Sequence, residues 1–496
     1  MEFATFPKNL AYNIKTLAGF SKTCVKLTPD RTAVKHGESF RCKLPSNTLI
    51  DLRTLCLYAK GTCEVTSGEA VHFPRNTSSL IKTLSVYVNG TLIERIDNYN
   101  ILYNKLYDLE CGVDQVSKRY LEISDPSVAY SVANDTTNAS PNILTSSATA
   151  TSTTGRKLCV NNWLGFISSA SCPCVDSNDF GVMEIEIELA NESVLWASAH
   201  ATAGTAPAPV GAKWKLDDVH FTISKIVFND PLYYNMKASK LLSSGLQIAY
   251  QTYVASKGSV VTKSSVSVNA TINTTSLDQL ICCYGPAVPS IQPLRLFGAN
   301  NANDSLNFAQ VLSGYNGLTD NITTASAGAG SGAGTPAKLQ RIGGQTGANT
   351  NEHDNTAGDA FNQSIFFKSD ATGLGTSSIE INNTPLAPQP LEDYEVFNET
   401  LIALGNNNLD MSVGVHQGMR SLSDFLKYYF AHIVSLENIS KNDDFYKSGL
   451  DGKSSALNIV WKQSYPTTGG NVVPYIFAKC TRIMQVNEGN SISIIV

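Results

Sequence analysis

The chain has 496 residues, of which 42% are hydrophobic and only 16% are charged. This length and hydrophobic content suffice to bury a large core in two or more domains, and they exclude an intrinsically disordered chain. The formal net charge of -5 excludes the strongly basic balance of a protein whose main task is to grip nucleic-acid phosphates. Ser, Thr, Asn and Gly supply much of the polar content, a balance that favours β-strands and turns.

The N-terminal stretch MEFATFPKNLAYNIKTLAGF lacks the charged start, apolar core and small-residue cleavage site of a signal peptide. We therefore expect synthesis in the cytosol, and we assign residues 1–22 to an N-terminal arm that precedes the first domain. The eleven cysteines are scattered and odd in number, which indicates buried free thiols made in a reducing compartment. The close pairs Cys172/Cys174 and Cys282/Cys283 do not have the spacing of a zinc site, so we expect no metal site.

In the first half, LSVYVNGTL alternates apolar and polar residues up to Asn89-Gly90 and predicts a strand and a hairpin turn. Tyr99, Leu102 and Leu106 follow at helical spacing. Further along, VMEIEIELA predicts a half-buried strand, since its apolar residues fall on one face. Its other face carries Glu184, Glu186 and Glu188, which we interpret as a solvated or interface face and not as an acid/base or calcium site.

The second half shows the same order in SSIEINNTPLAPQPLEDYEVFNETL: an alternating strand, an Asn turn, then Tyr394, Phe397 and Leu401 at helical spacing. Near its end, SLSDFLKYYFAHIVSL predicts another helix, with its apolar face running from Leu422 to Leu436 through Ile433.

Three pairs of segments, in the same order in both halves, indicate a duplication. TLCLYAKG and LICCYGP match Cys56 to Cys282, the two hairpin–helix segments match Tyr99 to Tyr394, and the closing strands FTISKIVFND and FAKCTRIMQVNEG match Lys225 to Arg482. We predict an all-β chain of two tandem eight-stranded jelly rolls with short helices and long surface loops. The predicted units are a first jelly roll at 23–232, a linker at 233–240 and a second jelly roll at 241–496.

The halves differ by loops that are poor in large apolar residues. The second half carries a long insertion at about 285–376, which includes GAGSGAG and Gly332, and the first carries VANDTTNASPNILTSSATATSTTG. Such composition predicts surface loops.

No catalytic motif stands out. GAGSGAG follows no predicted strand and lacks the Lys-Ser/Thr end of a phosphate-binding loop. The seven histidines show no pair at metal-ligand spacing. The dense acidic group Glu392, Asp393 and Glu395 is interpreted as the first turn of a helix that begins near Tyr394, where negative charge is favourable. We therefore expect no enzyme activity and no catalytic, cofactor-binding or metal-ligating residues.

The stretches FPRNTSSLIKTLSVYVNGTLIERIDNYNILYN, KSSALNIVWKQSYPTT and YIFAKCTRIMQV resemble the double jelly-roll major capsid proteins of eukaryotic double-stranded DNA viruses. The resemblance runs from about Lys22 to Val496 and is closer to the polinton-like virus and virophage type than to the nucleocytoplasmic large DNA viruses. It implies a homotrimeric pseudo-hexagonal capsomer that tiles an icosahedral shell, with neighbouring capsomers and penton and minor capsid proteins as partners. It also implies a place in the virion capsid.

The sequence departs from many large-virus homologues in its smaller size, which argues against elaborate outer towers. It has no basic arm strong enough to package DNA and no sign of sequence-specific nucleic-acid binding. Either an internal lipid membrane or a separate basic protein would then lie between shell and genome.

Two other classes are alternatives. A carbohydrate-binding or adhesive β-sandwich protein would expose aromatic residues on a concave face and would usually carry a signal peptide, which the sequence lacks. A glycan-processing enzyme would need two carboxylates that approach to roughly 5–10 Å.

Overall fold

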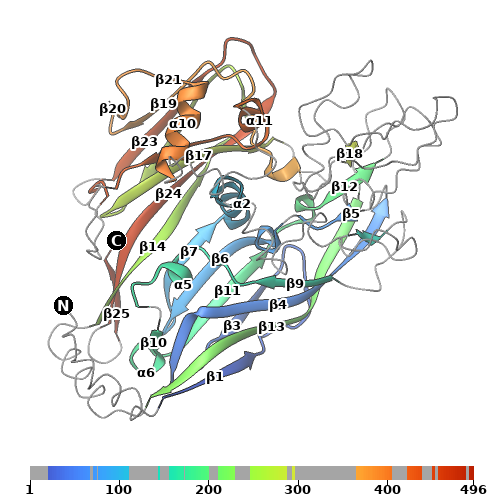
Figure 1. Cartoon of the computed structure of the whole chain (residues 1–496), viewed down its shortest axis with the longest axis vertical. Helices are drawn as coiled ribbons and strands as arrows, with labels where there is room; N and C mark the ends of the chain where they lie inside the picture. Colours follow the sequence, from blue (N-terminus) through green and yellow to red (C-terminus); the bar gives the residue numbers. More distant parts are fainter. Residues whose placement is uncertain are drawn as a thin grey trace, which may run out of the picture.

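A computed structural model of the chain shows two β-sandwiches, one in blue to green and the other in yellow to red (Figure 1). The structure describes residues 20–67, 71–74, 76–110, 143–145, 156–172, 174–199, 211–228, 246–287, 293–295, 365–404, 422–437, 449–452, 456–486 and 491–495.

The first sandwich has one sheet with the strand order β1-β13-β4-β10, to which β2 and β9 add, and a second sheet with the order β3-β11-β6-β7. Phe40 of β3 meets Phe221 of β13 between the sheets, with ring centroids 6.2 Å apart. The strands are β1 (Phe20–Leu27), β2 (Val34–Lys35), β3 (Ser39–Lys43), β4 (Leu49–Ser67), β6 (Ile81–Val88), β7 (Thr91–Asp97), β9 (Arg156–Val160), β10 (Cys174–Asp176), β11 (Met183–Leu189) and β13 (Gly211–Phe228). The helices are η1 (Thr77–Leu80), α2 (Tyr99–Glu110), α5 (Phe166–Ser169), α6 (Ser177–Phe180) and η2 (Glu192–Val194).

The second sandwich has sheets of order β14-β24-β17-β22, with β15 and β25 also on β24, and β16-β23-β19-β20, with β21 on β19. Tyr284 of β17 meets Trp461 of β23 between the sheets at 5.1 Å. The strands are β14 (Leu246–Lys257), β15 (Val261–Thr262), β16 (Ser265–Ile272), β17 (Leu277–Pro286), β19 (Thr376–Ile381), β20 (Thr384–Pro385), β21 (Leu391–Glu392), β22 (Ala431–Ser435), β23 (Leu457–Ser464), β24 (Asn471–Val486) and β25 (Ile492–Ile495). The helices are η3 (Ile365–Phe367), α10 (Asp393–Ala403) and α11 (Leu422–Tyr428).

The two sandwiches have the same strand order. In one pair of sheets β1, β13 and β4 correspond to β14, β24 and β17, and in the other β3, β11, β6 and β7 correspond to β16, β23, β19 and β20. Each order is that of an eight-stranded jelly roll, in which strands distant in sequence lie side by side. The predicted fold class is therefore confirmed, and the identical order agrees with a duplication.

The hairpin predicted in each half is present and has the same turn. Asn89 and Gly90 have φ values of 49° and 78° between β6 and β7, and Asn382 and Asn383 have φ values of 51° and 63° between β19 and β20. Two consecutive residues with positive φ form the turn whose twist matches the flanking strands. In both halves a helix follows, α2 in the first and α10 in the second.

Two residue-level matches between the halves are wrong, although the elements correspond. Cys56 is only half-buried because Leu55 and Leu57 take the core side of β4, whereas Cys282 is fully buried in β17, which is covered on both faces. Tyr99 is buried in α2, but Tyr394 is 54% exposed. The buried face of α10 instead carries Val396 and Thr400.

The helix predicted from Leu422 to Leu436 is too long. Helix α11 ends at Tyr428, and the residues that follow form β22, which pairs antiparallel with β17. Ile433 and Val434 are β-branched and therefore suit a strand. The prediction missed this strand because it considered only the helical spacing of the apolar residues.

A smaller sheet of order β18-β12-β5-β8 links the halves. It contains β5 (Val71–His72), β8 (Ile143–Thr145), β12 (Trp196–Ala199) and β18 (Pro293–Arg295). Strand β18 belongs to the predicted insertion at 285–376, and it pairs in parallel with β12 of the first half. Gly332, the linker 233–240 and residues 1–19 lie outside the described residues, while β1 begins at Phe20, inside the predicted arm 1–22. The domain boundaries stay a prediction.

Candidate functional site

The acidic strand β11 alternates as predicted, with its glutamates on the outer face of the sheet β3-β11-β6-β7 and its apolar residues buried. Each of the three glutamates lies close to a cation on a neighbouring strand. The pairs are Lys43 Nζ to Glu184 Oε1 at 3.4 Å, Arg41 Nη2 to Glu186 Oε2 at 2.9 Å, and Lys82 Nζ to Glu188 Oε1 at 2.6 Å. These are cross-strand pairs of the kind that stabilise a solvated sheet face.

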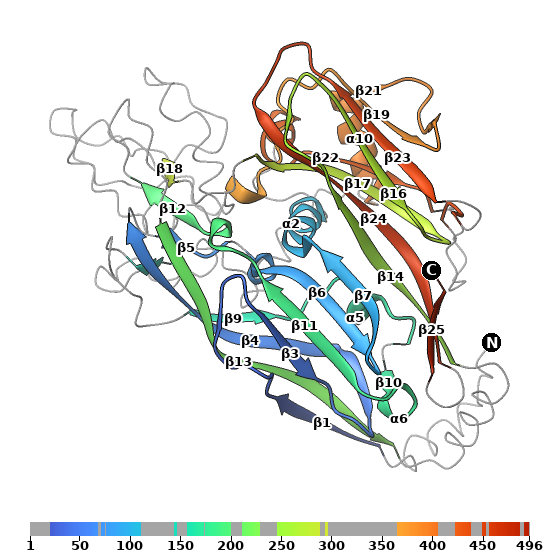
Figure 2. The same ribbon diagram turned by 180° about the vertical axis from the view of Figure 1, so that it is seen from behind.

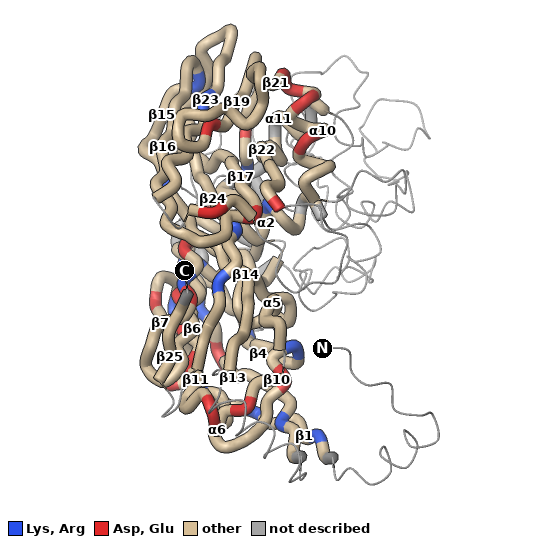
Figure 3. The backbone as a smooth tube through the Cα atoms, turned by 90° about the vertical axis from the view of Figure 1, so that its left-hand side faces the viewer, with Lys and Arg blue, Asp and Glu red and all other residues tan. Residues whose placement is uncertain are grey.

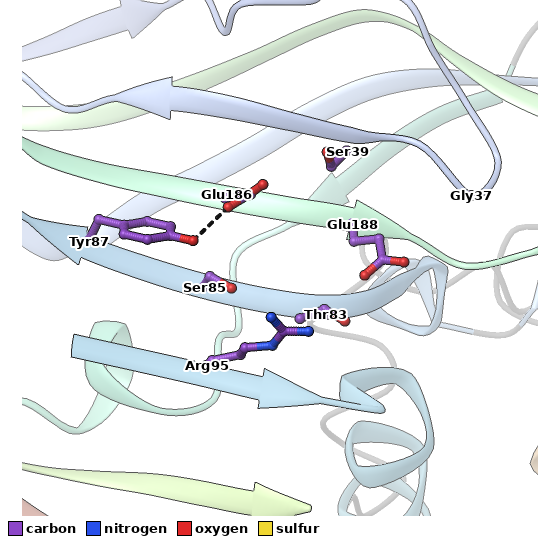
Figure 4. Close-up of a pocket in the computed structure, with 8 residues that line it drawn as sticks. All are labelled: Gly37, Ser39, Thr83, Ser85, Tyr87, Arg95, Glu186 and Glu188. Carbon is purple, nitrogen blue, oxygen red and sulfur yellow. Dashed lines mark hydrogen bonds between the residues drawn. The ribbon is translucent and has the colours of Figure 1, made fainter. Parts of the chain in front are cut away.

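A shallow depression of about 210 Å³ lies on this face, lined by Gly37, Ser39, Thr83, Ser85, Tyr87, Arg95, Glu186 and Glu188 (Figure 4). Tyr87 Oη donates a hydrogen bond of 2.9 Å to Glu186 Oε2. Partial burial raises the pKa of Glu188, but hydrogen bonds from Lys82 and Thr83 outweigh it and leave the pKa below its ordinary value. A glycosidase acid needs a carboxyl group with a raised pKa. Glu188 lacks that property.

The second acidic group caps a helix, as predicted. Glu392 is the N-cap of α10, its backbone N–H donates to Glu395 Oε2 at 2.8 Å, and its side chain accepts from the backbone in return. Asp393 lies in the first turn, where the helix dipole favours negative charge. The group therefore has a structural role.

Ten cysteines are described and all are free thiols, of which Cys24 and Cys172 are exposed, contrary to the expectation of burial. The expectation holds for Cys42, Cys63, Cys159, Cys282, Cys283 and Cys480. Within the described ranges, no three His, Cys, Asp or Glu side chains are grouped so that they could hold a metal ion.

A buried polar chain around His432 was not predicted. Ser377 Oγ lies 2.8 Å from His432 Nδ1, and His432 Nε2 lies 3.1 Å from Glu399 Oε2. Trp461 Nε1 donates to the same Ser377 Oγ at 3.1 Å. The serine is only 1% exposed, and no substrate can reach it. Because the three residues lie on β19, α10 and β22, no local motif reveals the chain of hydrogen bonds.

The two jelly rolls are joined along β14, which runs past α5 and β7 of the first roll (Figures 2 and 3). Tyr250 Oη donates to the Ile93 carbonyl oxygen at 2.7 Å, and Ser169 Oγ accepts from the Gln251 N–H at 2.8 Å. The Tyr250 ring packs edge-on against Phe166 with centroids 5.1 Å apart. A further contact between the rolls joins α2 to η3, where the buried Lys105 donates to the Phe367 carbonyl oxygen at 2.6 Å. We call this whole contact between the two jelly rolls, from Tyr250 and Gln251 to Lys105, the joint.

Glu94 of β7 lies buried in the joint, with 1% of its surface exposed. Its Oε2 accepts the Phe166 N–H at 2.8 Å, whereas its Oε1 and the Nε of Arg482 have no hydrogen-bond partner. A Cβ at Gly165 would overlap the Glu94 carboxyl group, so this position needs glycine, which also has a φ of 80°. Burial raises the pKa of Glu94 to about 7, although the Phe166 N–H, Thr252 and the charge of Arg482 act in the opposite direction.

Two jelly rolls that share the order of their main strands and are joined side by side define the class, a double jelly-roll protein. The solved structures that the chain resembles include proteins of virus shells. The chain is similar to the quasi-atomic model of the PBCV-1 virus capsid, with a TM-score of 0.51 and 11% identity, over 97% of this chain and 97% of that chain. It is also similar to the Faustovirus major capsid protein, with a TM-score of 0.50 and 9% identity, over 95% of this chain and 91% of that chain. The likeness at such identities is one of fold.

No protein-family model and no curated protein matches the sequence. Among the described residues, no helix combines the length and the apolar character that a membrane crossing requires.

Proposed function

We propose that the chain is a major capsid protein, and that three copies form a pseudo-hexagonal capsomer that tiles an icosahedral virus shell. The observation that carries the proposal is the shared strand order of the two jelly rolls. Three such chains in a ring present six similar units, so a threefold assembly acquires a nearly sixfold outline. The similarity of fold to the PBCV-1 and Faustovirus capsid structures, over almost the whole chain, supports it.

The partners that follow are the other two copies in the trimer, neighbouring capsomers, and penton and minor capsid proteins. The protein would be made in the host cytosol and reside in the virion capsid of a virus of the polinton-like or virophage type. The net charge of -5 supports a shell that does not itself package the genome. An internal membrane or a basic protein would then line the shell. The role is structural and not enzymatic.

The test is the mass and shape of the purified chain. Light scattering during gel filtration at micromolar concentration should give the mass of three chains, and negative-stain electron microscopy should show particles with a hexagonal outline. A monodisperse single chain would contradict the proposal.

The adhesive alternative finds no support in the described surface. A carbohydrate-binding face usually presents several aromatic rings. Among the large apolar side chains that the described residues expose, Tyr394 is the single aromatic one.

A further inference from the structure

The strand pair β14–β24 extends beyond the core of its own jelly roll. On one face of this strand pair, Ala478 and Cys480 point into that core. The next residue pairs on the same face are Tyr250–Arg482 and then Ile248–Met484. Tyr250, Ile248 and Met484 are 1%, 4% and 0% exposed. Tyr250 is covered by Phe166 and Ile93 of the first roll. The extended end of β14–β24 is therefore one side of the joint.

The corresponding pair in the first roll, β1–β13, extends in the same way but is uncovered. The core-facing pair Val25–Ile223 is followed on the same face by Thr23–Lys225 and then Ser21–Val227. Val227 is 48% exposed, and Ser21 and Thr23 are exposed as well. We call Ser21, Thr23, Lys225 and Val227 the strand-end surface. It corresponds in position to Ile248, Tyr250, Arg482 and Met484, which are buried except for the half-buried Arg482.

The other side of the joint also has an uncovered counterpart. In the first roll, β7 and α2 face the second roll. In the second roll, the matching segment from β20 through α10 exposes 37% of Leu386, 54% of Tyr394 and 51% of Ile402. Tyr394 and Ile402 lie two turns apart on α10, and hence on one side of it. We call these three residues the helix surface. They are three of the eight exposed large apolar side chains that the structure describes, and Val227 is a fourth.

The charges near the two surfaces are complementary. The strand-end surface contains the cation Lys225 of β13, which pairs with Thr23 of β1. The helix surface begins beside Glu392, Asp393 and Glu395 at the N-terminus of α10. Opposite charge across an interface favours one orientation of the partners over others.

We propose that the strand-end surface of one copy packs on the helix surface of a second copy of this chain, and so repeats between chains the joint that connects the jelly rolls within a chain. This inference rests on the proposed function, since it specifies how the trimer is held. The contact is head-to-tail: each copy gives its strand ends to one neighbour and its helix to the other. Such a contact closes into a ring when the rotation per copy is one third of a turn.

The test uses one substitution on each surface, Val227→Asp and Tyr394→Asp, in the full-length chain. Both side chains are exposed in the single chain, so each variant should keep the wild-type circular dichroism spectrum. Each should weaken assembly at least about 100-fold, because a charge buried at the centre of an interface has the effect of a hot-spot loss. Val260→Asp is the matched control, since Val260 is 53% exposed and belongs to neither surface. Thr23→Asp replaces Val227→Asp if the latter does not fold.

Mixing the two variants gives the sharpest result. The Val227→Asp chain keeps its helix surface and the Tyr394→Asp chain keeps its strand ends, so a 1:1 mixture can form one intact contact. Sedimentation should therefore give single chains for each variant alone, three chains for wild type and Val260→Asp, and two chains for the mixture. If wild type and both variants all form trimers of equal stability, the inference is wrong while the proposed function stands. A single-chain wild type would overturn both.

Discussion

At the residue scale, Glu94 is the group in the joint that makes the stability of the fold depend on pH. Its folded-state pKa is raised to about 7 from an ordinary value of 4.5, chiefly by burial. The folded chain therefore holds this proton more tightly than the unfolded chain. The resulting stability is fully present below about pH 4.5 and is lost as the pH rises through about 7.

We expect Glu94→Gln to reduce the loss of stability between pH 5 and pH 8 by roughly 3 kcal/mol, because glutamine stays neutral and can still accept the Phe166 N–H. Urea-unfolding midpoints at the two pH values measure this. Glu184→Gln, on the solvated outer sheet face, is the matched substitution with which the Glu94→Gln profile is compared. An unchanged dependence in Glu94→Gln would show that the joint does not titrate there.

The cysteines give a second residue-scale prediction. Burial raises the pKa of Cys283 to about 12, and it raises that of Cys282 as well, so neither provides a thiolate near neutral pH. Under native conditions both should react with a maleimide at least about 100-fold more slowly than the exposed Cys172, and all three should react alike in urea. Peptide mass spectrometry after timed quenching follows each site. Fast native labelling of Cys282 or Cys283 would place β17 at the surface.

At the element scale, the β6–β7 turn depends on backbone conformation alone. Gly90 has a φ of 78°, and a Cβ there would meet no atom within 4 Å. Gly90→Ala should therefore lower the free energy of unfolding by about 1 kcal/mol through its φ angle and not through a clash. Gly470→Ala is the control, because its Cβ also meets nothing within 4 Å and no positive φ is required. Equal effects of the two substitutions in thermal melts would contradict this explanation.

Elements with one solvent-exposed face and one buried face were predictable from the sequence. In β11 the alternation of glutamate with apolar residues identifies strand and face together, and Asn89-Gly90 identifies the turn. The prediction failed where an element is covered on both sides. Around Ile433, the apolar residues fit a helix and a strand equally, and only pairing with β17 decides for β22.

The joint and the His432 chain of hydrogen bonds were not predictable. Glu94 has the appearance of a surface residue in TLIERID, next to the exposed Arg95. It is buried because residues distant in sequence cover it: Gly165 and Phe166, and strand β14, which lies more than 150 positions away, as the Tyr250–Ile93 bond shows. Ser377, Glu399 and His432 likewise meet only after the second jelly roll has closed. Long-range contacts of this kind leave no local pattern, so a single sequence reveals the elements but not the partners of their polar residues.

At the scale of the whole molecule, the second jelly roll should not be stable by itself. Without the first roll, Tyr250 would lose the cover that the joint gives it, beside the apolar Ile248 and Met484 on the same face of β14–β24. A contiguous apolar patch of this kind promotes aggregation. If the chain is divided between residues 229 and 245, the C-terminal half alone should aggregate or bind a hydrophobic dye, and co-expression with the N-terminal half should restore a soluble complex. A monodisperse, dye-negative C-terminal half would contradict this.

The joint inside each chain also bears on how steeply assembly depends on concentration. A covalently linked contact forms at an effective concentration set by the connecting segment, which is millimolar for short flexible tethers. A ring of six separate jelly rolls would need five association events, each limited by dilution, whereas three linked pairs need two. Gene duplication would thus turn half of the ring contacts into folding events. For the proposed capsomer, the threshold concentration for assembly should be correspondingly low, and incomplete rings should be rare as the protein accumulates.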